Sequence, residues 1–172
     1  KSAALIGSIL YMYAPYRFLD IYVRGAYPES FAFIFPPLML LSLYKIFYKC
    51  QKKGFILAVL SLSGIILSHN VMTLFFIPIY VLYALGLFLV KKDIKKLISV
   101  NVSLLFSLMV TSFYWIPAFF EKKSVNLNNL DASAGFTSNF VGLKNIFYSK
   151  WAWGPLGSNS PMSLQIGLIQ QG

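Results

Sequence analysis

The sequence predicts an all-α protein: a polytopic transmembrane helical bundle of about five spans, some partial, with an outer-face loop and an extracytoplasmic tail. Hydrophobic residues make up 58% of the chain and charged residues only 12%, whereas soluble proteins carry roughly 45–50% and about 25%. Apolar runs alternate with short basic segments along most of the sequence. A chain with so few charges lacks the polar exterior that a soluble domain requires.

The first apolar run covers residues 2–14, which is shorter than the roughly 20 residues that a membrane crossing needs. We therefore expect upstream sequence to complete this helix, and both ends to belong to a longer protein. Pro15 is expected to end the helix, because proline cannot donate to the helical hydrogen-bond ladder. An outer-face loop is then predicted over residues 15–28.

The second span is predicted to begin at Glu29 or Ser30 and to end at a basic loop over residues 49–54. Pro28 suits the first turn of this helix, and the Glu29 carboxylate complements the positive end of its dipole. Pro36 and Pro37 should kink the helix in its middle.

The third and fourth spans are predicted over residues 55–68 and 71–90, joined by a tight turn at His69 and Asn70. The third span carries a face of small residues, which favours close packing of helices in a membrane. These small residues are Ser61, Ser63 and Gly64.

A second basic loop over residues 91–96 precedes the fifth predicted span, residues 97–120. This span completes a membrane region over residues 1–120. The polar stretch 121–162 predicts an extracytoplasmic loop with a short interfacial helix. Residues 163–172 predict the start of a further span.

Two lysine clusters set the predicted orientation and account for eight of the fifteen basic residues. They are Lys45, Lys49, Lys52, Lys53, Lys91, Lys92, Lys95 and Lys96. The positive-inside rule makes loops 49–54 and 91–96 cytoplasmic, which places 15–28 and 121–162 outside. The net charge of +10 therefore indicates topology and no nucleic-acid partner. Membrane lipid is the expected partner, since lysines near a bilayer attract anionic headgroups.

The candidate site residues gather on the predicted outer face. Ionisable groups close to a membrane are costly and are candidates for function. Arginine suits phosphate because its planar fork donates two parallel hydrogen bonds, and a neighbouring carboxylate can orient it, hold a metal or act as a base. The candidate catalytic residues are Asp20 and Glu29. The candidate substrate-binding residues are Arg17, Arg24, His69, Asn70 and Tyr16.

Each candidate also has a structural interpretation. Arg17 with Asp20, and Arg24 with Glu29, are candidate ion pairs that hold the loop. His69 at a helix end is typical of a cap, and a metal-ligand role is the alternative. Five tyrosines are candidates for interface aromatics or for a sugar-stacking platform. They are Tyr11, Tyr13, Tyr16, Tyr22 and Tyr27.

The sequence lacks a glycine-rich phosphate loop, HExxH, GxSxG and CxxC. With one histidine and one cysteine, Cys50, it cannot form a complete His/Cys zinc site. The metal ligands are therefore unknown at this point.

Several motifs carry a resemblance to a known family. They are YxYxPYRxxDxYVRGAxxExxAF, SHN before an apolar helix, FYWIPAFFEKKxV and WAWGPxGSNSPMSLQIG. Together they resemble the bacterial and archaeal membrane proteins termed 6-pyruvoyl-tetrahydropterin synthase-related. The resemblance implies the plasma membrane of a prokaryote and a multi-pass topology. It does not imply pterin chemistry, because the soluble synthases bind zinc through several histidines.

That family is in turn similar to the C-type (GT-C) glycosyltransferase superfamily. The resemblance implies transfer of sugar from a polyprenyl-phosphate-linked donor on the outer face, and a divalent cation, Mg or Mn, as cofactor. The resemblance also implies that Arg17 or Arg24 binds the phosphate of the donor. It implies that Asp20 or Glu29 has an accessory acid role. It also implies a main catalytic acid upstream of Lys1. The alternative is a non-enzymatic transporter, flippase or assembly factor for envelope lipids or glycans.

Overall fold

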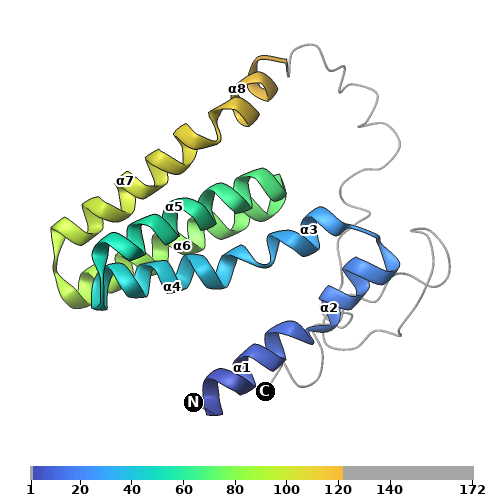
Figure 1. Cartoon of the computed structure of the whole chain (residues 1–172), viewed down its shortest axis with the longest axis horizontal. Coiled ribbons are helices and arrows are strands. Elements are labelled where there is room, and N and C mark those ends of the chain that lie inside the picture. Colours follow the sequence, from blue (N-terminus) through green and yellow to red (C-terminus); the bar gives the residue numbers. More distant parts are fainter. Residues whose placement is uncertain (1, 122–172) are drawn as a thin grey trace. The chain divides into compact units, whose positions relative to one another are not determined.

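The computed structural model describes residues 2–121 (Figure 1). Its described residues fall into two compact units, residues 2–27 and residues 28–121. The first unit contains α1 (Ser2–Met12), α2 (Pro15–Phe18) and the π-helix η1 (Leu19–Val23). The second contains α3 (Tyr27–Ala32, from Pro28 onward), α4 (Phe35–Tyr48), α5 (Gln51–Ser68), α6 (Asn70–Lys91), α7 (Ile94–Val110) and α8 (Ser112–Glu121). Every element in this described range is helical, as the sequence predicts.

Residues 15–28 are not the loop that the sequence predicted, because α2 and η1 occupy most of this segment. Pro15 lies in the first turn of α2, where its missing N–H is harmless and its fixed φ favours a helix. The same residue therefore separates α2 from α1 and also starts α2. The segment turns at Gly25, whose φ of +62° suits glycine.

The second unit is built around α5, which packs against α4, α6 and α7 (Figure 1). The connections are shorter than predicted. Residues Lys49–Cys50 join α4 to α5, His69 joins α5 to α6, and Lys92–Asp93 join α6 to α7. Most of the predicted basic loops 49–54 and 91–96 is therefore helical.

The two central prolines act where the sequence predicted a kink. The chain is helical to Ala32, turns at Phe33–Ile34, and resumes as α4. Pro36 and Pro37 consequently lie in the first turn of α4, where the ladder needs no N–H donor from them. The helix start is Tyr27 instead of Glu29 or Ser30.

Two glycines of α5 allow its close approach to α4. A Cβ on Gly54 would lie 2.7 Å from the Ile46 nitrogen and 2.9 Å from the Ser42 carbonyl oxygen. A Cβ on Gly64 would overlap the Phe35 ring. The predicted small-residue face on α5 is therefore a packing surface.

Buried hydroxyl groups in the bundle bond mainly to the backbone of their own helices. Ser42 donates to the Met39 carbonyl at 2.6 Å, Ser103 to Val100 at 2.7 Å, and Thr111 to Ser107 at 2.8 Å. These hydroxyl groups are thus satisfied without any water, which lets them lie inside apolar helices.

The described residues contain three helical stretches long and apolar enough to cross a membrane: Tyr27–Tyr48, Gln51–Ser68 and Asn70–Lys91. A fourth is possible if α7 and α8 count as one broken span, since they are bent by 66°. About five spans were predicted, with residues 97–120 as the fifth. The chain turns tightly after Thr111, where the Tyr114 N–H bonds back to the Thr111 carbonyl.

The predicted interfacial helix in 121–162 and the further span at 163–172 fall almost entirely outside the described residues.

Candidate functional site

A buried carboxylate anchors the candidate site of the first unit. Tyr16 and Asp20 lie four residues apart in the helical segment α2–η1, and Arg24, four residues further on, is its C-cap in a right-handed helical conformation, so the three share one face. Arg24 Nη1 donates to the Tyr16 hydroxyl at 2.7 Å and to Asp20 Oδ1 at 3.1 Å. The Asp20 side chain is fully buried, whereas that of Arg24 is 34% exposed. The carboxylate therefore fixes the guanidinium of an arginine that still reaches solvent.

The ion pair between Arg24 and Asp20, at 3.1 Å, is one that the sequence did not suggest. Helical geometry explains it, because positions i and i+4 face each other once the segment forms a helix. The expected pairs of Arg17 with Asp20 and of Arg24 with Glu29 stay predictions.

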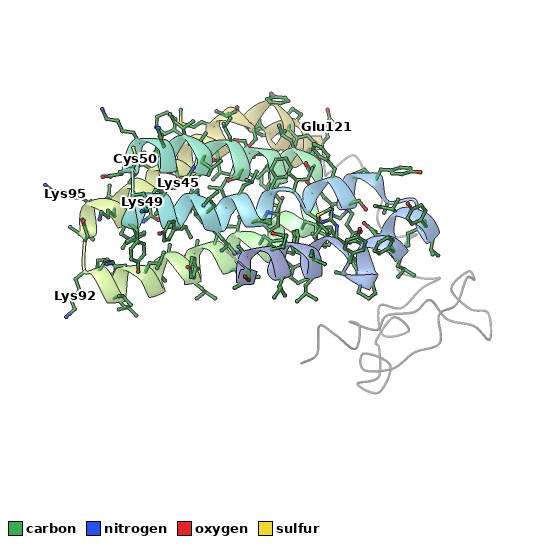
Figure 2. All side chains as sticks on the ribbon, turned by 60° about the horizontal axis from the view of Figure 1, so that its bottom comes forward. Lys45, Lys49, Cys50, Lys92, Lys95 and Glu121 are labelled. Atoms are coloured by element: carbon green, nitrogen blue, oxygen red, sulfur yellow. The ribbon has the colours of Figure 1, made fainter. Side chains whose placement is uncertain are left out.

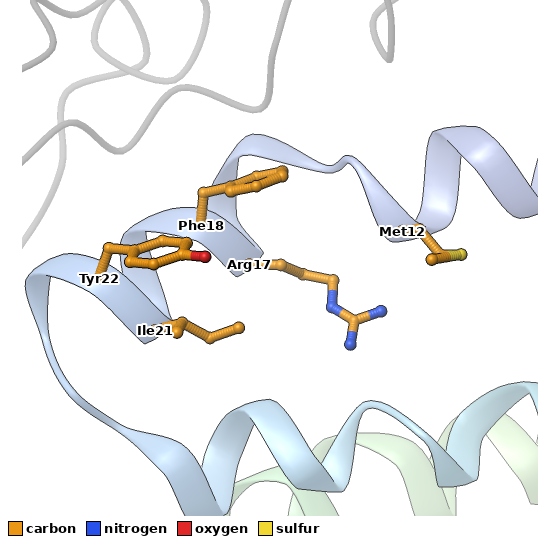
Figure 3. A pocket seen from close by; sticks show the side chains of 5 residues that line it. All are labelled: Met12, Arg17, Phe18, Ile21 and Tyr22. Atoms are coloured by element: carbon orange, nitrogen blue, oxygen red, sulfur yellow. The ribbon is translucent and has the colours of Figure 1, made fainter.

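Arg17 lies beside a cavity. The cavity holds about 190 Å³ and is lined by Met12, Arg17, Phe18, Ile21 and Tyr22. Figure 3 shows the Arg17 side chain extending between Met12 and Ile21. Its guanidinium also lies 5.4 Å from the centre of the Tyr11 ring, within the range of a cation–π contact. One cation thus lies among apolar and aromatic walls.

An aromatic column runs next to this cavity. The Phe18 ring stacks with the Tyr13 ring, with centroids 5.9 Å apart, and with the Tyr22 ring, at 6.2 Å. Tyr22 is 69% exposed, so its ring remains accessible. Of the predicted tyrosines, Tyr11 lies against Arg17 and Tyr16 bonds to Arg24. Tyr27 is also exposed.

Glu29 lies in α3 and is buried, with 8% of its surface exposed. Its position in the first turn of that helix agrees with the expected dipole interaction.

His69 is the N-cap of α6, as its structural interpretation predicted. Its Nδ1 accepts a hydrogen bond from the Met72 N–H at 3.3 Å. An Nδ1 that accepts must be unprotonated, which leaves the proton of the neutral ring on Nε2. The cap therefore occupies the ring nitrogen that faces α6.

Asn70 bonds to α8. The Tyr114 hydroxyl donates to Asn70 Oδ1 at 3.1 Å, and the Trp115 Nε1–H donates to the Leu108 carbonyl at 3.0 Å. Sequence reasoning did not select Tyr114 or Trp115 as site residues, although both belong to the FYWIPAFF motif. The sequence could not indicate these two residues, because their contacts depend on the turn at Thr111, which brings α8 back toward the start of α6.

The residues of a divalent cation site do not come together in the part of the chain that the structure describes. No three His, Cys, Asp or Glu side chains are grouped there. The donor set expected for Mg²⁺ or Mn²⁺ is several carboxylate and carbonyl oxygens, which residues 2–121 do not assemble from acidic side chains.

Comparison with known proteins gives the family. Residues 1–157 match the family of membrane proteins described as 6-pyruvoyl-tetrahydropterin synthase related domain. An uncharacterized protein of Lactococcus lactis subsp. cremoris (strain MG1363) is 26% identical over 162 residues, which cover 91% of the chain. The chain spans about a quarter, 26%, of that relative's length. No solved structure matches the chain. The apolar helices and the match over residues 1–157 together show that the chain belongs to the 6-pyruvoyl-tetrahydropterin synthase related family of membrane proteins.

Proposed function

We propose that this membrane protein is glycosyltransferase-like and takes its sugar from a polyprenyl-phosphate-linked donor on the extracytoplasmic face of a prokaryotic plasma membrane. In the proposed multi-pass topology, loops 49–54 and 91–96 are cytoplasmic, while 15–28 and 121–162 are outside.

The cavity at Arg17 is the observation that carries this proposal. Its volume of about 190 Å³ is well above the roughly 10–15 Å³ that a single water requires and accommodates a phosphate group. The guanidinium suits the phosphate oxygens because it donates two parallel hydrogen bonds. The apolar walls, Met12 and Ile21, suit an isoprenoid chain attached to that phosphate. A free sugar phosphate would gain little from those walls.

The neighbouring residues support a saccharide on the same phosphate. The exposed Tyr22 ring ends an aromatic column, and sugars stack on such rings through their apolar faces. Arg24, held by Asp20 and Tyr16, does not line the cavity and is a second arginine of the same unit that could donate to the phosphate of a larger ligand. In this proposal the fully buried Asp20 acts on Arg24 as a positioning residue.

The proposed reaction is a direct displacement. The acceptor hydroxyl oxygen forms a bond to the anomeric carbon of the sugar. The bond between that carbon and the phosphate oxygen breaks, and its electron pair leaves with the polyprenyl phosphate. The hydroxyl proton passes to a carboxylate base. The arginines stabilise the charge that develops on the leaving phosphate.

A second candidate is a non-enzymatic flippase, transporter or assembly factor for envelope lipids or glycans. One observation favours it: Asp20, a candidate base, is fully buried against Arg24 and thus shielded from an acceptor. Such a protein would use the Arg17 cavity to hold the lipid phosphate without breaking a bond.

Binding of a polyprenyl-phosphate sugar to the full-length protein in detergent tests the proposal. Arg17→Ala should raise the dissociation constant about 10–100-fold, the effect of losing a charge-assisted hydrogen bond. Arg17→Lys is the matched variant; it keeps the charge but loses the fork, so its loss should be smaller. A polyprenol without phosphate should bind equally to all three proteins. Unchanged binding by folded Arg17→Ala protein would contradict the proposal.

A transfer assay separates the two candidates. Asp20→Asn and Glu29→Gln test the two carboxylates separately: loss of transfer with donor binding retained identifies the base, whereas weaker donor binding in Asp20→Asn is expected of a positioning residue. If lipid-linked sugar binds and moves across vesicle membranes without transfer to any acceptor, the flippase function replaces the transferase.

A further inference from the structure

One end of the second unit concentrates positive charge. Eight lysines lie in or beside the α4–α5 and α6–α7 connections, while Asp93 is the only acid between residues 42 and 98. Figure 2 shows Lys45, Lys49, Lys92 and Lys95 together at this end and Glu121 at the other. We call this region the basic end. It comprises Lys45, Lys49, Lys52, Lys53, Lys91, Lys92, Lys95 and Lys96.

Two lysines join the connections to each other. Lys96 Nζ donates to the Phe47 carbonyl at 2.9 Å, across 49 residues of sequence. Lys91 Nζ lies 4.3 Å from the centre of the Tyr48 ring, in cation–π contact. Both contacts bind α6 and α7 residues to the last turn of α4. The basic end is therefore one surface formed by two segments that are distant in sequence.

The remaining six ammonium groups are not neutralised within the described part of the chain. Asp93 pairs with Lys96 at 3.4 Å, and its Oδ1 also caps α7 by accepting the Lys95 and Lys96 backbone N–H groups. No described acidic side chain pairs with Lys45, Lys49, Lys52, Lys53, Lys92 or Lys95. Like charges held so close repel each other unless an anion lies among them.

The surroundings of these cations select the kind of anion. Leu89 and Val90, directly before Lys91, are 71% and 73% exposed, and Ile94 and Ile98 beside the other lysines are each 54% exposed. Three helices that meet at this end are long and apolar enough to cross a membrane. The ammonium groups thus lie where exposed apolar surface ends, at the depth of lipid phosphates. Free phosphate or nucleic acid would leave the exposed apolar side chains unused.

We propose that the basic end is a binding site for the headgroup of an anionic phospholipid. The phosphate lies between the lysines of the two connections, and the acyl chains pack along the exposed side chains of α6 and α7. The contacts of Lys91 and Lys96 with α4 hold the two connections together. The six lysines without an acidic partner among the described residues attract the phosphate. This site is separate from the Arg17 cavity and does not depend on its function.

The test measures binding of phosphatidylglycerol to the full-length protein in detergent by native mass spectrometry. Phosphatidylcholine with the same acyl chains serves as the zwitterionic probe. We expect wild-type protein to retain phosphatidylglycerol preferentially. Lys92→Gln/Lys95→Gln should weaken phosphatidylglycerol binding roughly thirtyfold, because each of the two lysines near the bilayer surface contributes about fivefold to the binding constant. Added inorganic phosphate at millimolar concentration should not displace the lipid.

The matched control is Lys122→Gln/Lys123→Gln, which removes the same charge from the segment that the predicted topology places on the opposite side. It should leave phosphatidylglycerol binding unchanged. Equal losses in both double variants would overturn the site, as would equal retention of the two lipids by wild-type protein. If Lys92→Gln/Lys95→Gln does not fold, Lys49→Gln/Lys52→Gln replaces it with the same expectation. Displacement by inorganic phosphate would also overturn the proposal, because the ligand would then be the free anion.

Discussion

The two units of the described chain use polar groups in opposite ways. In the first unit, Asp20 is buried and holds Arg24, and Arg17 faces a cavity. In the second unit, the buried hydroxyls of Ser42, Ser103 and Thr111 bond to the backbone of their own helices. The charges of that unit collect mainly at one end. The comparison teaches that buried polar groups of the bundle bond within its own helices, whereas the first unit places a charged side chain beside a cavity.

The packing of the bundle predicts the largest effect. Gly54→Ala should lower the free energy of unfolding by about 3 kcal/mol, the upper part of the range for overpacking. Its Cβ would meet backbone atoms of Ile46 and Ser42, which cannot move without shifting α4. Thermal unfolding in detergent measures the change. Gly86→Ala is the control, because nothing lies within 4 Å of its Cβ. Equal stability of both variants would refute the close α4–α5 contact.

The buried carboxylate of the first unit predicts a smaller loss. Asp20→Asn should cost about 2 kcal/mol, because it removes the buried charge that accepts a hydrogen bond from Arg24 at 3.1 Å. Asp93→Asn is the control: Asp93 caps α7 through a side-chain oxygen, and asparagine caps a helix about as well. Chemical denaturation in detergent compares the two. A larger loss at Asp93 than at Asp20 would reverse the contrast between the units.

The cap of α6 predicts the smallest effect. His69→Ala should destabilise the protein by about 1 kcal/mol, the usual cost of removing an N-cap acceptor. His69→Asn restores a side-chain oxygen for the Met72 N–H and should recover most of that stability. Hydrogen exchange at Met72 measures the local effect. Loss of lipid-linked sugar binding in the stable His69→Asn protein would instead give the imidazole a functional role.

Much of the second unit could be predicted from the sequence, because the length and boundaries of apolar helices depend mainly on residues close together along the chain. Hydrophobic runs, lysine clusters and prolines are all read along the chain, so the helical class and the basic end could be foreseen. The capping role of His69 followed from its position between two apolar runs. The small residues of α5 likewise predicted close packing.

The tertiary structure decided what depends on register and on contacts between distant residues. The helical form of residues 15–23 placed Tyr16, Asp20 and the C-cap residue Arg24 on one face, although the prolines and glycine of this segment favour a loop locally. The bend after Thr111 brought Tyr114 to Asn70, 44 residues away, and no local pattern encodes that approach. Composition and periodicity by themselves determined that this is a helical membrane protein with a basic end. Only packing decided which charges meet, because an ion pair or a cavity depends on angles between side chains that the linear sequence does not contain.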